Sequence, residues 1–313
     1  MRPRPFYHFV KFFSTLAKLL VKIQLSIFFS CPVFGEEGCL DLFRKEARPE
    51  VKVRFGIGKS SSIRRLLAIV AMGVEEAAIL KSLGTYEEFV ISSSLGITAK
   101  IFRKMDKELL LVTSGIGNVY AGMTTALVAD KFQIDGVILF GVAGALKQGL
   151  EIGQLVIASR VIQHDSIYSG ESGIQLMAPG APFVSVNPDA RENPVFETDP
   201  RFRKWLLNAL QGNSKVKFIE GTLLSGSEFV GSAIRKRAIG STQQDSLAVE
   251  MEAAGIAVVV RRLNLPFAVL KTVADRLNPD QSISNDYNQF IQGAAENAGG
   301  VMDVIWKSWI GDE

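Results

Sequence analysis

The segment Leu66-Leu-Ala-Ile-Val-Ala-Met72 is an uninterrupted run of apolar residues in a chain of 313. A strand that is apolar at every position is buried on both faces, as parallel strands covered by helices are. Residues 74–83 follow with apolar side chains at helical spacing and stop at Gly84, a residue that commonly ends helices. We therefore expect a buried strand followed by a helix.

The same alternation continues along the chain. Further strands are predicted at residues 88–104 (a pair), 109–113, 136–140, 154–162, 217–224 and 267–273. Further helices are predicted at residues 118–131, 199–211, 248–263 and 285–309. This order predicts an α/β fold: a single domain with a mixed, mostly parallel central sheet flanked by helices on both sides.

The charge of the chain is unevenly distributed. Residues 1–35 contribute +5, residues 36–66 contribute +3 and the remainder −5 to the net charge of +3. The sequence pI of about 8.8 therefore reflects the N-terminal part. It is no sign that the folded domain binds nucleic acid, and we expect none as a partner.

Cysteine and histidine are scarce. Cys31 and Cys39 both precede the regular pattern, and His8 and His164 are the two histidines. The body can build neither a disulfide framework nor a thiolate metal site, and a Ser-His-Asp triad would depend on His164 alone. Catalysis would rest on carboxylates, hydroxyls and backbone groups, with no metal and no cofactor.

The N-terminal part has features of a targeting segment. Residues 1–35 combine basic side chains, an apolar stretch at 23–29 and a plausible signal-peptidase site before Glu36-Glu37. The apolar stretch is too short to span a membrane, and its flanking lysines equally suit a basic amphipathic targeting helix. Export, organelle targeting and a cytoplasmic location all stay open. Membrane contact would come only through this segment if it is not cleaved. Residues 36–65 are interpreted as a linker and 66–313 as the catalytic domain.

Polar or glycine-rich residues follow several predicted strands. They are Ser114-Gly-Ile-Gly117, Gly141-Val-Ala-Gly144, Ser225-Gly-Ser-Glu-Phe229 and Ala274-Asp275. Sheets of this class bind ligands outside the carboxyl ends of their strands, and glycine lets backbone amides approach a ligand closely.

A further acidic segment, Val249-Glu-Met-Glu-Ala-Ala-Gly255, is predicted to begin an apolar helix. Acids in a first helical turn interact favourably with the helix dipole, which accounts for one glutamate more readily than for two. At a spacing of two residues, Glu250 and Glu252 would point to different faces of that helix.

Taken together, these segments resemble the nucleoside phosphorylase superfamily and, within it, the methylthioadenosine/S-adenosylhomocysteine nucleosidases. The similarity covers roughly residues 66–309. Its marks are Ala71-Met-Gly-Val-Glu75, Ser114-Gly-Ile-Gly117, Gly141-Val-Ala-Gly-Ala-Leu146, Gly153-Gln-Leu-Val-Ile157, Ser225-Gly-Ser-Glu-Phe229, Val249-Glu-Met-Glu-Ala-Ala254 and Val273-Ala-Asp275.

The resemblance implies two catalytic carboxyl groups. Asp275 matches the general acid that protonates N7 of a purine base as the ribose gains oxocarbenium character. Desolvation at a closed, apolar strand end would favour its protonated form, as that role requires. Glu75 matches the residue that orients and deprotonates the attacking water.

The resemblance also implies the substrate-binding residues. They are Glu252 for the ribose hydroxyls, Met251 beneath the sugar, Phe229 stacked on the base with the main chain of Phe229 and Val230 at its edge, Ser114 and Lys271 near the water, Gly144 at the strand end and Tyr287 near the 5′ substituent. Three positions depart from the family pattern: Ala274 replaces Ser or Thr, Lys271 replaces Arg, and Ser227 replaces Asp. Residues 165–198 match poorly.

The expected reaction is hydrolysis of the N-glycosidic bond of a purine nucleoside, methylthioadenosine or S-adenosylhomocysteine, with release of adenine. Phosphorolysis is an alternative, but Leu139 stands where phosphorolytic relatives carry Arg, and Glu75 would repel phosphate. A non-catalytic nucleoside-binding or storage protein of the same fold is the other alternative. The resemblance further implies a homodimer.

Overall fold

The computed structural model describes residues 63–171, 173–179, 194–212, 216–278, 282–284 and 287–311, with the backbone alone for 283–284 and 287–290. The predicted targeting segment 1–35 and nearly all of the predicted linker 36–65 lie outside these residues, so both remain predictions. Within the described part, no helix is both long and apolar enough to cross a membrane.

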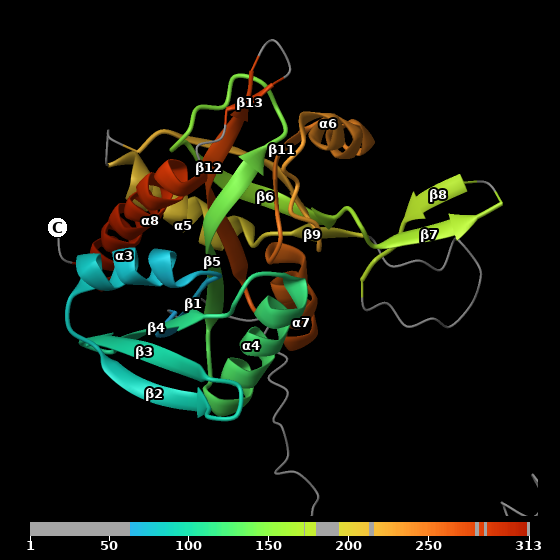
Figure 1. Ribbon diagram of the computed structural model, residues 1–313. Coiled ribbons are helices and arrows are strands. Elements are labelled where there is room, and N and C mark those ends of the chain that lie inside the picture. Colours follow the sequence, from blue (N-terminus) through green and yellow to red (C-terminus); the bar gives the residue numbers. More distant parts are fainter. Residues whose placement is uncertain are drawn as a thin grey trace, which may run out of the picture. The chain divides into compact units, whose positions relative to one another are not determined.

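The described residues form an α/β domain in which strands and helices alternate (Figure 1). The strands are β1 (Arg65–Val70), β2 (Glu87–Ser92), β3 (Ile97–Lys104), β4 (Lys107–Thr113), β5 (Gly136–Ala145), β6 (Leu155–Gln163), β7 (Ile167–Gly170), β8 (Gly173–Leu176), β9 (Val195–Glu197), β10 (Phe218–Ser225), β11 (Ser246–Glu250), β12 (Phe267–Leu277) and β13 (Ile283–Ser284). The helices are α3 (Gly73–Leu83), α4 (Asn118–Lys131), α5 (Pro200–Gln211), α6 (Ala233–Thr242), α7 (Ala253–Leu263) and α8 (Tyr287–Ile310).

The central sheet is mixed and is organised around β5. This strand pairs in parallel with β1 and β12, and its last residues pair antiparallel with β11. Because β12 pairs with β6 as well as with β5, the strands β12, β6, β10, β11 and β5 close into a ring. The registers bring four strand ends together, since Ala248 of β11 pairs with Ala145 of β5, Ser225 of β10 with Glu250 of β11, and Asp275 of β12 with Gly144 of β5. The strands β7 and β8 form a separate two-stranded sheet.

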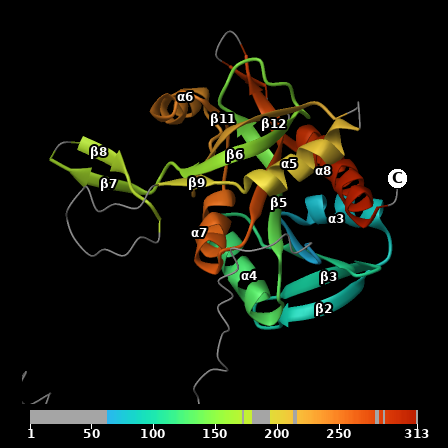
Figure 2. The same ribbon diagram turned by 180° about the vertical axis from the view of Figure 1, so that it is seen from behind.

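Helices cover both faces of the sheet, as predicted (Figures 1 and 2). Leu66, Ala68 and Val70 of β1 pack in one apolar cluster with α3, α5 and α8. Leu67 and Ile69 belong to a second cluster, with α4 and α7, on the opposite face. Burial on both faces is the reason that β1 is apolar at every position.

The prediction of one helix over residues 248–263 is wrong at its start. Residues Ser246–Glu250 form β11, and α7 begins at Ala253. A short apolar run fits a buried strand or a buried helix equally well, and here pairing with β10 and β5 decides. Glu250 therefore ends a strand and does not lie in a helical first turn. The sequence also gave no indication of α6 or of the β7–β8 hairpin.

Helices α4 and α7 pack unusually closely at their first turns. Gly255 of α7 lies against the backbone of Asn118, and a Cβ added at Gly255 would lie 1.9 Å from the Asn118 carbonyl oxygen. No side chain fits there unless the two helices move apart. The sequence Ala-Ala-Gly255 thus sets the distance between two helices that begin beside the carboxyl ends of the strands.

We predict that Gly255→Ala lowers the free energy of unfolding by about 3 kcal/mol, the upper part of the range for overpacked sites, as measured by urea denaturation. Gly293→Ala is the matched control, because Gly293 lies within α8 and an added Cβ there meets nothing within 4 Å. That control should be neutral or more stable by up to about 1 kcal/mol. Equal stability of Gly255→Ala and the wild type would contradict the close packing.

Candidate active site

A cavity of about 340 Å³ opens at the carboxyl ends of the central strands. Its volume is within the range of small-molecule sites. It is lined by Ala71, Met72, Glu75, Ile116, Val142, Ala143, Gly144, Glu228, Phe229, Val230, Gly231, Val249, Glu250, Met251, Glu252, Lys271, Ala274 and Asp275. The three acids that sequence reasoning placed at a shared site, Glu75, Glu252 and Asp275, thus border one cavity although they are far apart in the chain.

Glu75 lies in the first turn of α3 and is buried. Its Oε2 accepts hydrogen bonds from the backbone N–H groups of Ala71 and Met72, each at 2.9 Å. Its Oε1 is buried and, among the described residues, has no hydrogen-bond partner. Burial raises the pKa of Glu75, while the charge of Lys271 and the two backbone hydrogen bonds oppose that rise. The site therefore holds a fixed carboxyl group with one oxygen available for a ligand or water.

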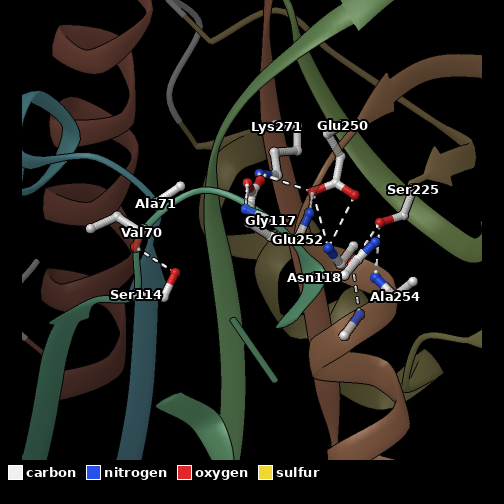
Figure 3. A network of polar contacts seen from close by, with 12 residues as sticks. Val70, Ala71, Ser114, Gly117, Asn118, Ser225, Glu250, Glu252, Ala254 and Lys271 are labelled. Carbon is white, nitrogen blue, oxygen red and sulfur yellow. Dashed lines mark hydrogen bonds and ion pairs between the residues drawn. The ribbon is translucent and has the colours of Figure 1, made fainter. Parts of the chain in front are cut away.

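Lys271 joins two further carboxylates (Figure 3). Its Nζ lies 3.0 Å from Glu250 Oε2 and donates to Glu252 Oε2 at 2.9 Å. All three side chains are at least 94% buried, since the side-chain exposed fractions are 1% for Lys271, 1% for Glu250 and 6% for Glu252. The expectation that the two glutamates point to different faces of a helix is wrong, because Glu250 belongs to β11 and both side chains converge on Lys271.

The two glutamates differ in their ionisation. Burial raises the pKa of Glu250. Burial acts in the same direction on Glu252, but the charge and hydrogen bond of Lys271 and the Gly117 amide outweigh it and lower the pKa of Glu252. The pKa of Lys271 is itself raised, since three nearby carboxylates outweigh its desolvation. Lys271 and the Gly117 amide thus favour the ionised form of Glu252, in which both oxygens accept hydrogen bonds.

Backbone amides at helix starts hold the two glutamates in place. The N–H of Gly117, which precedes α4, donates to Glu252 Oε1 at 3.0 Å. The N–H groups of Glu252 and Ala253, at the start of α7, donate to Glu250 at 3.0–3.1 Å. These amides have no partners within their own helices, and a carboxylate is the acceptor that a helix N-terminus favours.

A neutral network next to these acids fixes the start of α7 (Figure 3). Ser225 Oγ accepts from the Ala254 N–H at 3.0 Å and lies 3.1 Å from Asn118 Oδ1. Asn118 Oδ1 also accepts from the Gly255 N–H at 2.8 Å. Sequence reasoning missed the roles of Asn118 and Ser225, because a polar residue beside a glycine turn has no pattern that names its partner.

Asp275 lies at a bulge in β12. The pairing of β12 with β5 shifts between Val273 and Asp275, so Asp275 lies opposite Gly144. Asp275 Oδ1 accepts from the Ala145 N–H at 2.8 Å and from the ammonium of Lys236. The sequence predicted apolar surroundings for Asp275. The structure differs, because the buried ammonium of Lys236 contacts its carboxyl group. Lys236 was also missed: it stands between two arginines in Ile234-Arg-Lys-Arg237, a pattern typical of a solvated helix face.

Several predicted binding residues line the cavity near Asp275. Val230 is buried, whereas Phe229 is 64% exposed at the edge of the cavity. The carbonyl oxygen of Phe229 accepts from the Gly231 N–H at 3.1 Å, so a tight turn already engages the backbone that was expected to read the base edge. Met251 and Gly144 also line the cavity.

Two predicted residues are not placed at the cavity. Ser114 is not among the lining residues, and its hydroxyl donates to the carbonyl oxygens of Val70 at 3.3 Å and Gly115 at 2.8 Å. Tyr287 begins α8, but its side chain lies outside the described residues. The roles of both remain predictions. Among the described residues, no three His, Cys, Asp or Glu side chains are grouped as a metal ion requires.

Fold and site define the class of protein. Residues 65–305 match the model of the phosphorylase superfamily, and the chain belongs to this superfamily. It is 30% identical over 247 residues to the 5′-methylthioadenosine/S-adenosylhomocysteine nucleosidase of Staphylococcus epidermidis. This match covers 78% of the chain and 100% of the relative. The family resemblance and the α/β fold class inferred from the motifs are thus confirmed.

Solved structures agree with this assignment. The S. pneumoniae 5′-methylthioadenosine/S-adenosylhomocysteine nucleosidase, solved with a transition-state inhibitor, is 30% identical with a TM-score of 0.63, over 78% of this chain and 99% of that one. The futalosine hydrolase of Helicobacter pylori is 25% identical with a TM-score of 0.63, over 79% and 99%.

We predict that Lys271→Met lowers the free energy of unfolding by about 3–5 kcal/mol in a urea titration, because it leaves two buried carboxylates without their cation. Lys307→Met is the matched control, since the Lys307–Asp303 pair is exposed on α8. That control should cost less than about 1 kcal/mol. Similar losses in the two variants would show that the buried ion pair does not stabilise the fold.

Proposed function

We propose that this protein is a nucleosidase that hydrolyses the N-glycosidic bond of a purine nucleoside, with methylthioadenosine and S-adenosylhomocysteine as its substrates and adenine as the released base. The observation that carries the proposal is the placement of Glu75, Glu252 and Asp275 around one cavity. The two nucleosidases named above, each matched over nearly its whole length, support the same reaction.

Each acid has surroundings that suit one step of this reaction. Glu252, ionised and fixed by Lys271 and Gly117, would accept hydrogen bonds from the ribose hydroxyls. Glu75, with a raised pKa and an unpartnered Oε1, would hold the attacking water and take its proton. Asp275 would deliver a proton to N7 of the purine, so that the base leaves without a negative charge.

The charges around the cavity favour water over phosphate as the nucleophile. Among the described lining residues, Lys271 is the one lysine, arginine or histidine, and it is already paired with Glu250 and Glu252. A phosphate ion would have to enter beside the buried carboxyl of Glu75 without a free cation. Phosphate-binding sites supply cations or several backbone amides, whereas the amides of Ala71 and Met72 are occupied by Glu75 here.

We propose further that two chains form a homodimer next to the cavity mouth. Ile116 lines the cavity yet is 50% exposed, and Val119 and Tyr120 beside it on α4 are also exposed. Apolar side chains gathered at the mouth of a site are suited to burial by a second subunit.

The proposal is tested by incubating the full chain with methylthioadenosine, S-adenosylhomocysteine, adenosine, inosine and futalosine, with and without phosphate. We expect adenine release from the first two at the same rate in both buffers. Asp275→Asn and Glu75→Gln should each lower kcat by about 10²–10⁴-fold, the usual contribution of a general acid or base, while circular dichroism stays native.

Glu76→Gln is the matched control. Glu76 neighbours Glu75 on α3, but it pairs with Lys100 at 2.8 Å and does not line the cavity, so its kcat should equal that of the wild type. Strict dependence on phosphate would replace hydrolysis by phosphorolysis. A protein that binds adenine but releases it from no nucleoside would indicate a binding or storage role.

The raised pKa of Glu75 predicts the acid limb of the pH profile. Glu75 must be ionised to accept a proton from water, and its pKa lies above the ordinary value of 4.5. We therefore expect kcat/KM to fall as the pH decreases through a midpoint above 4.5, not at or below it. Initial rates between pH 4 and 9, with a check that the fold survives at each pH, measure this midpoint. In Glu75→Gln the residual activity should lack this limb.

A further inference from the structure

A lysine that the proposed mechanism does not use is buried behind Asp275. Lys236 of α6 has no exposed surface, and its ammonium contacts Asp275 Oδ1. Among the described residues, Asp275 is the charged group whose charge acts on this ammonium. Lys236 does not itself line the cavity. A buried ammonium is costly unless it is paired and hydrogen-bonded, so this contact accounts for a lysine at a core position.

The contact leaves the two oxygens of Asp275 unequal. Oδ1 accepts from both the Ala145 N–H and Lys236. Oδ2 has no donor among the described residues, although Asp275 lines the cavity. Two donors on one oxygen fix the plane of the carboxyl group. The second oxygen is thereby left for a ligand.

Gly144 on the neighbouring strand allows this arrangement. A Cβ added at Gly144 would lie 2.8 Å from Lys236 Nζ and 3.1 Å from Asp275 Oδ2. Any side chain there would press on both partners. The lysine, the aspartate and the glycine come from α6, β12 and β5, and they form one close-packed unit.

We propose that Lys236 is a positioning residue for Asp275, an inference that rests on the proposed nucleosidase function. Residue 274 is alanine and offers no hydroxyl group to orient the neighbouring carboxyl, and Lys236 supplies a donor from another element. As the bond between the sugar and the base breaks, its electron pair moves to the base and the proton on Asp275 Oδ2 moves to N7. The negative charge that remains on Asp275 is stabilised by the Lys236 ammonium.

The test compares Lys236→Met, Lys236→Arg, Asp275→Asn and the double variant Lys236→Met/Asp275→Asn in the full chain. Lys236→Met should lower kcat by about tenfold to a hundredfold with KM changed less than about threefold, as expected for an interaction that strengthens in the transition state. Lys236→Arg should retain kcat within about fivefold, because it keeps the charge.

The double variant separates positioning from a structural role. In the Asp275→Asn background, Lys236→Met should cause no further loss of kcat, because the lysine acts through the aspartate. A purely structural role would lower kcat by the same factor in both backgrounds.

Three outcomes would overturn the inference. They are a Lys236→Met variant with the wild-type kcat, an equal loss of kcat in the Asp275→Asn background, and a Lys236→Met variant whose lower activity merely follows its folded fraction in circular dichroism. Each leaves the nucleosidase function standing, provided that the wild type releases base. A wild type that releases base from none of the five nucleosides contradicts the proposed function itself.

Discussion

The buried ammonium of Lys271 holds together three parts of the chain that the fold brings to one place. It joins β12 to the end of β11 through Glu250 and to the start of α7 through Glu252. Without this cation, two carboxylates at least 94% buried would face each other, and burial would favour their neutral forms. Lys271 thus favours the ionised form of Glu252, and the charge of Lys271 limits the rise in the pKa of Glu75. Stability and the chemistry of the cavity depend on the same contact.

Backbone N–H groups at helix starts also hold the acids of the cavity in place. The acids at 75, 250 and 252 each accept hydrogen bonds from backbone N–H groups at or beside the beginning of α3, α7 or α4. Those amides point outward from their helices and would otherwise need water. Since the helices follow strands whose carboxyl ends meet, their free amides converge on the cavity. A backbone arrangement common to α/β folds therefore acts together with Lys271 to hold these acids in place.

Strands and helices can be predicted from the sequence where a strand is buried on both faces, as β1 is, or where apolar residues recur at helical spacing, as in α4. It fails at residues 246–252, since an apolar run of five residues does not distinguish a strand from a helix. The acids of the candidate site could be named in advance because their motifs resemble those of a known family. Lys236 could not, since its neighbours Arg235 and Arg237 suggest a solvated face and its partner lies 39 residues away. Only its contact with Asp275, beside Gly144, identifies it.

The bulge at Ala274 explains how one strand serves both halves of the cavity. In a regular strand, Asp275 would share the face of Val273, which is fully buried in the apolar cluster beneath α4 and α7. The extra residue shifts the alternation by one, so that Val273 pairs with Ala143 while Asp275 pairs with Gly144 and takes its face.

Lys271 precedes the bulge and neutralises Glu252, the acid proposed to bind the sugar. Asp275 follows the bulge and contacts Lys236 at the end of the cavity proposed for the base. Lys271 pairs with Gly141 and Asp275 with Gly144, so the two positions are three steps of β5 apart, roughly 10 Å along the strand. Because the displaced carboxyl leaves the apolar face, it requires a new partner, and the buried ammonium on α6 is the group that the fold brings to it.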